Sequence, residues 1–405
     1  MSFSKLLLLA TVAFSLISCD LSNSNNQIET PSEYKFSRNN ESSVSFTGQT
    51  TRIKMATELV SSMKDFDNAT EESLLQMFRN QTENGGDADP FSSAYLNAAT
   101  KNIKGKVAAS ADYFSANTAI SSEIKAQFET WISNQVNEVF PNENVQAEPG
   151  VAGQIADGSS TRYVNSKGFE YNQLVAKGLI GSLMTDQILN NYLSPSVLDA
   201  GTKREDNDDE VTEEGASFTT MEHNWDEAYG YLFGNSENQG NPIPTIGQDD
   251  DFLNEYVGKV ESDEDFSGIA QEIFNAFALG RAAISETDYE LRDEQALILK
   301  ERISTVIAVR AIYYLQAGKT ALQSEIPNYG TAFHDISEGT GFVYSLQFTH
   351  VPGTSNPYFT KTEVDGFLDQ LQSGNGLWDV TSETLDNISA EIAAKFEFSV
   401  EEAAN

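Results

Sequence analysis

Apolar residues recur every three or four positions along most of this 405-residue chain. This spacing places them on one side of an α-helix, because a helix completes a turn in 3.6 residues. In residues 49–64 the apolar stripe comprises Ile53, Ala56, Leu59, Val60 and Met63. The same pattern predicts helices over residues 70–81, 90–103, 121–140, 170–193, 220–233, 263–285, 288–317, 331–347, 362–372 and 382–397.

Strand patterns, in which apolar and polar residues alternate, are scarce in this sequence. The best candidate is residues 341–351, which suit a buried helix equally well. The sequence therefore predicts an all-α fold of antiparallel helical bundles. The chain is long enough for two bundle subdomains. We place them at residues 46–196 and 219–405, joined by an acidic loop over residues 197–218.

The N-terminus has a different pattern. Lys5 precedes an apolar run over residues 6–14, in which Thr11 is the one polar residue, and Leu16-Ile17-Ser18-Cys19 follows. A charged start, a short apolar stretch and a small residue before the cut predict a secretory signal over residues 1–18. The run is too short to span a membrane, since a transmembrane helix needs roughly 20 apolar residues.

Cys19 is the only cysteine in the chain. Leu16-Ile17-Ser18-Cys19 resembles the bacterial lipobox, in which the cysteine sulfur receives a diacylglycerol before cleavage. The resemblance implies a lipoprotein anchored in the cell envelope, with the outer membrane as the expected location. A plain signal with a chance cysteine and an uncut signal anchor are the alternatives. Residues 19–45 are rich in Asn and Ser, which predicts a flexible tether.

The chain is strongly acidic, with a formal net charge of −36. This charge argues against nucleic acid as a partner, because phosphate binding needs a basic face. It also argues against contact with anionic lipid headgroups beyond the anchor. Two interpretations of the acidity stay open, namely solubility outside the cytoplasm and a negative field that concentrates cations.

The most distinctive segment begins at Thr219, which has capping-box spacing to Glu222 and predicts a helix start. At 100° per residue, His223 and Glu227 lie one turn apart, and Asp226 lies to the other side of His223. We therefore expect Glu222, His223, Asp226 and Glu227 to converge on a cation, iron or another divalent ion. The alternative is structural: His223 pairs with Glu227, Glu222 only caps the helix, and Trp225 belongs to the core.

Two arginines bear on this choice. Arg281 and Arg310 continue apolar rows of the predicted helices over residues 263–285 and 288–317. An arginine that faces the core needs a carboxylate partner or an anionic ligand, because an unpaired buried charge is very costly. We expect one or both to reach the acids near His223, unless they extend to water. Such pairing would make the cluster a structural ion-pair network and weaken the case for a metal.

The stretch Glu-His-Asn-Trp-Asp-Glu-Ala-Tyr-Gly-Tyr at residues 222–231 resembles the signature of an uncharacterised domain family of Bacteroidota lipoproteins. Residues 48–52 and 280–284 fit that family too. The chain is more distantly similar to the imelysin-like proteins, which are all-helical, exported and linked with iron uptake. Their motif has His, then Glu three residues later, and ends in Phe-Gly. His223 and Phe233-Gly234 match it, although this ending lies about three residues further on, and Asp226 replaces Glu. The similarity implies an iron-related site and outer-membrane uptake proteins as partners.

Two other segments are weaker candidates for metal binding. Residues 206–217 have the acids of a calcium loop but carry Val211 and Ser217 where the turn glycine and the closing glutamate are needed. His334 and Glu338 form a second candidate metal pair. Familiar catalytic motifs are absent from the sequence.

We therefore expect a non-enzymatic lipoprotein that binds a cation. The alternative is an interaction subunit of a surface uptake or assembly complex, in which the cluster is purely structural. A hydrolase that uses paired acids is the least favoured possibility.

Overall fold

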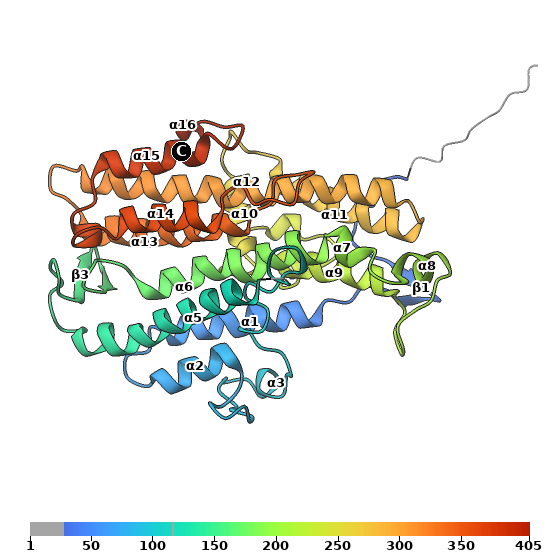
Figure 1. Cartoon of the computed structure of the whole chain (residues 1–405), viewed down its shortest axis with the longest axis horizontal. Coiled ribbons are helices and arrows are strands. Elements are labelled where there is room, and N and C mark those ends of the chain that lie inside the picture. Colours follow the sequence, from blue (N-terminus) through green and yellow to red (C-terminus); the bar gives the residue numbers. More distant parts are fainter. Residues whose placement is uncertain (1–27, 116) are drawn as a thin grey trace, which may run out of the picture.

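The computed structural model describes residues 28–115 and 117–405. The predicted signal, Cys19 and residues 20–27 of the predicted tether lie outside this range. Long helices run along the longest axis of the molecule, and the C-terminus lies beside α16 on its flank (Figure 1). The predicted all-α class is confirmed. Within the described residues, no helix combines the length and the apolar character needed to cross a lipid bilayer.

The first half of the chain folds into helices of mixed length. They are α1 (Thr47–Ser62), α2 (Glu71–Arg79), α3 (Ala94–Asn97), α4 (Ala111–Phe114), α5 (Thr118–Asn134) and α6 (Tyr171–Leu179). Two of them continue in a wider π-helical winding. This winding covers Gln135–Val139 after α5, and Ile180–Thr185 and Ile188–Tyr192 after α6.

The second half contains the longest helices. Its elements are α7 (Pro195–Leu198), α8 (Lys203–Asp208), α9 (Thr220–Phe233), α10 (Leu253–Glu261), α11 (Ile269–Ser285), α12 (Tyr289–Leu322), α13 (Tyr329–Ser345), α14 (Lys361–Leu371), α15 (Ser382–Ala393) and α16 (Val400–Ala403). Most of the helices predicted from the apolar stripes are confirmed, with ends displaced by a few residues.

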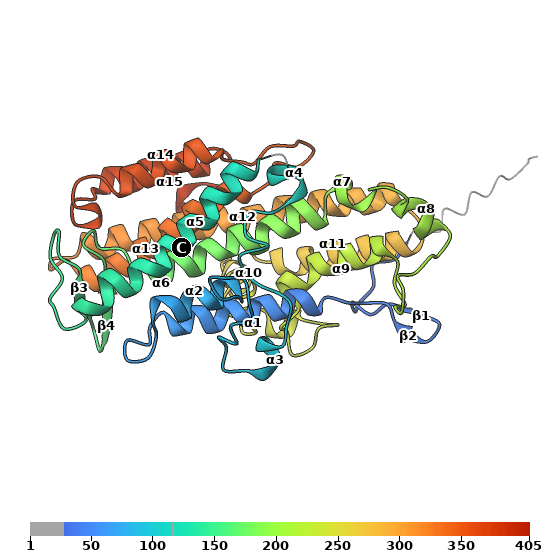
Figure 2. The same ribbon diagram turned by 60° about the horizontal axis from the view of Figure 1, so that its bottom comes forward.

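Strands are confined to two antiparallel hairpins in the described part of the chain. β1 (Ser37–Arg38) pairs with β2 (Glu41–Ser42), and β3 (Gly153–Asp157) pairs with β4 (Ser160–Val164). The first hairpin lies beside α8 at one end of the molecule, and the second lies at the opposite end (Figures 1 and 2).

One hydrophobic core runs through the described residues. Helix α12 packs against α11, α13 and α15, while α6 packs against α5 and α13. Helix α1 packs against α9. The contacts of α6 with α13 and of α1 with α9 join helices from the two predicted subdomains, 46–196 and 219–405. The segment between these subdomains, predicted as an acidic loop, includes the short helix α8.

One local prediction is wrong, and one ambiguous segment is resolved. Residues 90–103 form only the short α3, because the Asn97 side chain binds the backbone N–H and C=O of Phe91 and competes with helix hydrogen bonds. For residues 341–351, where the sequence suited a strand and a helix equally well, the structure shows a helix: α13 extends to Ser345 and a 3₁₀ turn follows. This segment is buried on all sides, and burial on all sides removes the periodicity that separates helix from strand.

The tether prediction also fails for residues 28–45. Tyr34 is only 3% exposed and Ser43 only 2%. The chain forms β1 and β2 here and then enters α1. The partners that hold this segment in place come from α9 and α11, far along the sequence.

Candidate functional site

Helix α9 carries the predicted site and begins where the capping box indicates. The Thr219 side chain accepts a hydrogen bond from the Glu222 backbone N–H, and Glu222 Oε2 accepts one from the Thr219 N–H at 2.8 Å. Trp225 is completely buried, and its Nε1 donates to the Phe277 carbonyl of α11 at 3.0 Å. Trp225 therefore joins α9 to α11, as the structural alternative required.

Arg281 of α11 is completely buried and points at the acids of α9. Its Nε donates to Asp226 Oδ1 at 3.1 Å, and its Nη1 lies 2.9 Å from Glu222 Oε1. Nη1 also donates to Ser285 Oγ at 2.8 Å, and Nη2 donates to both oxygens of Ser43 at 3.2 and 3.3 Å. Every guanidinium nitrogen has a partner. The expected pairing of Arg281 with the cluster is confirmed.

Residues 34–45, here called the N-terminal segment, bind the same two acids from the other side. The Tyr34 hydroxyl donates to Asp226 Oδ1 at 2.6 Å. Arg38 donates to both oxygens of Glu222, at 2.7 and 3.2 Å. The Ser45 backbone N–H donates to Asp226 Oδ2 at 3.3 Å. We call Tyr34, Arg38, Glu222, Asp226 and Arg281 the arginine–carboxylate cluster.

Aromatic packing reinforces this attachment. The Tyr34 ring stacks on the Tyr229 ring with centroids 3.7 Å apart, and the Arg281 guanidinium lies 4.8 Å from the centre of the Phe36 ring. Such cation–π contacts favour a buried guanidinium.

Two glycines admit the close approach of neighbouring elements. A Cβ on Gly230 would lie 2.3 Å from Phe46 Cβ, and one on Gly280 would lie 2.1 Å from Trp225 Cζ2. Each distance is far below van der Waals contact. The glycines of the sequence signature therefore have a packing role.

The other two predicted ligands, His223 and Glu227, face elsewhere. His223 is half-buried, stacks on Phe218 at 4.6 Å and has its Nδ1 3.0 Å from the Ser45 carbonyl oxygen. Glu227 accepts hydrogen bonds from Gln49 Nε2 at 2.7 Å and from the Tyr192 hydroxyl at 3.3 Å. The structure thus brings Glu222 and Asp226 together and directs Glu227 to a different set of partners.

Arg310, the second predicted supporting arginine, does not reach these acids. It lies on α12 with its guanidinium against three tyrosine rings, at 4.0 Å from Tyr313, 4.6 Å from Tyr314 and 5.6 Å from Tyr256. The expectation fails because the stripe of α12 that holds Arg310 faces α10 and α13, whereas the cluster lies between α9 and α11.

The electrostatics of the cluster follow from burial and from the arginines. Burial raises the pKa of Asp226 to about 6, against the lowering effect of the Arg281 charge. Burial acts on Glu222 in the same direction, but Arg281 and Arg38 hold the pKa of Glu222 below its ordinary value. Burial and the neighbouring Asp226 raise the pKa of Tyr34, so its hydroxyl stays a donor.

The geometry offers little to a metal ion. Within residues 28–115 and 117–405, no group of three or more His, Cys, Asp or Glu side chains is arranged to hold one. In the second predicted pair, His334 Nδ1 lies 3.1 Å from Glu170 Oε1, and Glu338 lies 3.3 Å from Lys177 Nζ. Glu338, the one acid of this pair, is thus engaged by a protein cation, as Glu222 and Asp226 are.

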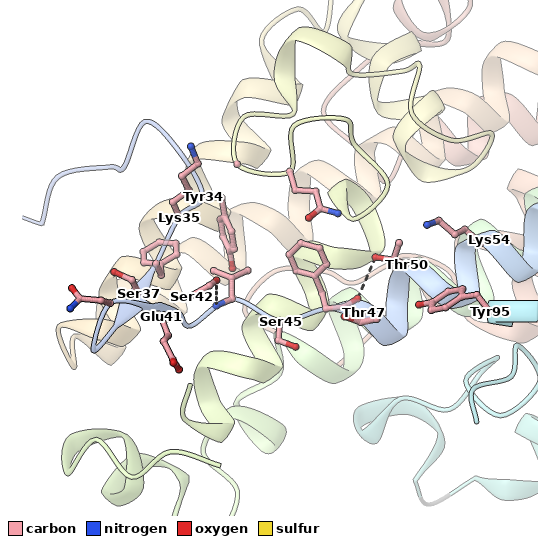
Figure 3. Close-up of a pocket in the computed structure, with 16 residues that line it drawn as sticks. Tyr34, Lys35, Ser37, Glu41, Ser42, Ser45, Thr47, Thr50, Lys54 and Tyr95 are labelled. Atoms are coloured by element: carbon pink, nitrogen blue, oxygen red, sulfur yellow. Dashed lines mark hydrogen bonds between the residues drawn. The ribbon is translucent and has the colours of Figure 1, made fainter. Parts of the chain in front are cut away.

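A pocket of about 700 Å³ lies along the N-terminal segment and the start of α1. Figure 3 shows Ser37 and Glu41 at one end of this pocket and Lys54 and Tyr95 at the other. Tyr34 and Ser45 belong both to the pocket wall and to the contacts with Asp226. The pocket therefore adjoins the arginine–carboxylate cluster through these two residues.

Sequence reasoning missed Tyr34 and Arg38, which lie in the predicted tether. The sequence does contain a pattern that could have revealed them: the large side chains of Tyr34, Phe36 and Arg38 alternate with Lys35 and Ser37 within an otherwise polar region. Such alternation marks a segment with one buried side.

Comparison with known proteins gives one result. A family model described as a domain of unknown function (DUF4856) matches residues 31–399. The match contains all five residues of the arginine–carboxylate cluster. No curated protein and no solved structure shows significant similarity to this chain.

Proposed function

Because this chain belongs to the DUF4856 family, whose function is unknown, we propose its function from its own residues. The protein is a lipid-anchored, non-catalytic interaction subunit of the cell envelope. Its arginine–carboxylate cluster fixes the segment that follows the anchor to the helical bundle. The anchor at Cys19 would then hold the bundle through a short connection rather than through a long flexible tether.

The main support for this proposal is that the carboxylates of Glu222 and Asp226 already have protein partners. Glu222 and Asp226 already accept hydrogen bonds from Arg281, Arg38 and Tyr34. A cation bound to these oxygens would have to displace Arg281, which would leave a buried charge without a partner. The structural role therefore agrees better with the geometry than cation binding does.

Cation binding at Glu222, His223, Asp226 and Glu227, with iron as the first choice, is the second candidate. The half-buried His223 ring is the observation in its favour. The proteins to titrate with iron(II) are the wild type, His223→Ala and the matched control Asn224→Ala. We expect no saturable binding that depends on His223. Saturable binding lost in His223→Ala and kept in Asn224→Ala would instead establish the cation site.

Membrane anchoring through Cys19 and association with other proteins can be tested together. Cells that express the wild type or Cys19→Ser can be fractionated, and the membrane fraction solubilised in mild detergent. We expect the wild type in the membrane fraction, in a particle larger than one chain with its detergent. Cys19→Ser should lose the membrane association, while the control Ser24→Ala should keep it. A wild-type chain that is extracted as a monomer would contradict the interaction role.

A further inference from the structure

Arg310 differs from the other arginines of the chain in its partners. Seven arginines each form at least one ion pair with a carboxylate, namely Arg38, Arg79, Arg162, Arg204, Arg281, Arg292 and Arg302. Arg52 donates to the carbonyl oxygens of Asn102 and Gly48. Arg310 has no hydrogen bond or ion pair with any residue that the structure describes, and its buried Nε has no acceptor.

Arg310 is nevertheless only 6% exposed. The tyrosine rings around it attract its positive charge, but the face of a ring is not an oxygen acceptor for its N–H groups. A buried, unpaired guanidinium is costly, so an acceptor brought by a ligand would bind favourably. Arginine presents its donors in a planar fork that matches a carboxylate.

A pocket of about 640 Å³ opens over this arginine, where α10, α12 and α13 meet. Its wall includes Arg310, Tyr313 and Tyr314 of α12. Four acids also line it, namely Asp263, Glu264, Asp265 and Asp335. The acids are half-buried or exposed, whereas Arg310 is deep. Lys259 of α10 lines the pocket too, but its Nζ already pairs with Glu255 Oε1 at 3.3 Å. The pocket thus has an unpaired cation at its floor and a rim in which acids predominate.

This charge pattern selects the ligand. A simple anion such as phosphate would be repelled by the four acids before it reached Arg310. A simple cation would be held at the rim and would leave Arg310 without an acceptor. A molecule with a carboxylate and an ammonium group satisfies both parts, with the carboxylate on the arginine fork and the ammonium near the acids.

We propose that the pocket over Arg310 binds a small zwitterion, a free amino acid or a short peptide. Arg310 takes the carboxylate, Asp335 and the acids at residues 263–265 take the ammonium group, and Tyr313 and Tyr314 form the walls. The site is separate from the arginine–carboxylate cluster and does not depend on the role proposed for it.

The test uses the full chain in mild detergent, with calorimetric titration of each of the twenty amino acids and of the dipeptide Ala-Ala. We expect at least one to bind with a Kd of about 1 mM or tighter. The Arg310→Gln variant should weaken that binding by at least about tenfold, as expected for hydrogen bonds to a charged group. Arg302→Gln removes an arginine of the same helix outside this pocket and should bind as the wild type does.

Analogues of the bound compound separate the two halves of the site. Amidation of its carboxylate should weaken binding to the wild type but make no difference in Arg310→Gln. Acetylation of its amine should weaken binding to the wild type and make little difference in Asp335→Asn. Melting curves show whether each variant is folded, and Arg310→Lys keeps the charge while losing the fork. Absence of binding by all compounds, equal binding by Arg310→Gln, or tighter binding of inorganic phosphate would overturn the proposal.

Discussion

At the scale of single residues, the centre of the molecule depends on charges that are buried together. Arg281 and Asp226 are both completely buried, and Glu222 is 1% exposed. Each alone would be costly in the core, and their mutual hydrogen bonds offset that cost. Such a network also fixes geometry, because its donors and acceptors fit only one arrangement of α9, α11 and the N-terminal segment.

The glycine in front of Arg281 allows this arrangement, since any Cβ on Gly280 would collide with Trp225. We expect Gly280→Ala to destabilise the protein by about 1–3 kcal/mol, as overpacking does. The matched control is Gly366→Ala in α14, where a Cβ would meet no atom within 4 Å. That change should stabilise the protein by about 0.5–1 kcal/mol, because alanine favours a helix. Urea unfolding of both variants provides the measurement; a neutral Gly280→Ala would disprove the tight contact.

At the scale of elements, sequence periodicity predicted the helices well because most of them present one apolar side to a common core. The capping box fixed the start of α9 to the residue, since its hydrogen bonds join positions only three apart. The contacts of the N-terminal segment could not be predicted in this way. Arg38 and Glu222 lie 184 positions apart, and a window of local sequence contains no information on such a pair. The same limit explains why Arg281 and Arg310 looked equivalent.

The attachment of the N-terminal segment can be measured by hydrogen exchange. In the wild type, the Ser43 N–H donates to the Phe36 carbonyl and the Tyr34 N–H to the Gly240 carbonyl. We expect Tyr34→Ala to raise the exchange rates of amides 34–45, because it removes the bond to Asp226 and the stack on Tyr229. Amides in α12 and α13 should be unchanged.

Tyr95→Ala is the control for this experiment, since Tyr95 is 53% exposed. It should leave the exchange of amides 34–45 as in the wild type. If the amides of the wild-type segment already exchange at the rate of an unfolded chain, the segment is not attached to the bundle, and residues 28–45 are a flexible tether as the sequence predicted.

At the scale of the whole molecule, a net charge of −36 surrounds one continuous core. Self-repulsion of this charge disfavours the compact state, and it weakens as acids become protonated. Burial raises the pKa values of Asp186, Asp226 and Asp335 to about 6 and that of Asp250 to about 7. The folded state therefore takes up protons at a pH at which these acids are still ionised in the unfolded chain.

We thus expect the protein to become more stable as the pH falls from 8 to 5.5. The four acids bind protons more tightly in the folded state than in the unfolded chain. Their protonation therefore begins to stabilise the fold as the pH falls through 7 and 6. This stabilisation is complete once the pH lies below the pKa values of the same acids in the unfolded chain. His350, whose pKa burial lowers to about 4, acts in the opposite direction. Because four acids oppose one histidine, we expect the melting temperature to rise by at least about 2 °C.

Scanning calorimetry at the two pH values tests this expectation. Asp250→Asn removes the acid whose pKa burial raises most among these four and should reduce the rise. A melting temperature that falls between pH 8 and 5.5 would show that the buried acids are ionised at little cost.

The central claim is that Asp226 and Arg281 stabilise each other and thereby join α9, α11 and the N-terminal segment. A double-mutant cycle with Asp226→Ala and Arg281→Ala tests it most directly, with the solvent-accessible pair Lys395 and Glu363 as the matched control. Each central single variant should lose about 3–5 kcal/mol of unfolding free energy, because it leaves a buried charge unpaired. The double variant should lose less than the sum, with a coupling of about 1–3 kcal/mol, against about 0.2–1 kcal/mol for the control. A coupling of zero between Asp226 and Arg281 would contradict the account.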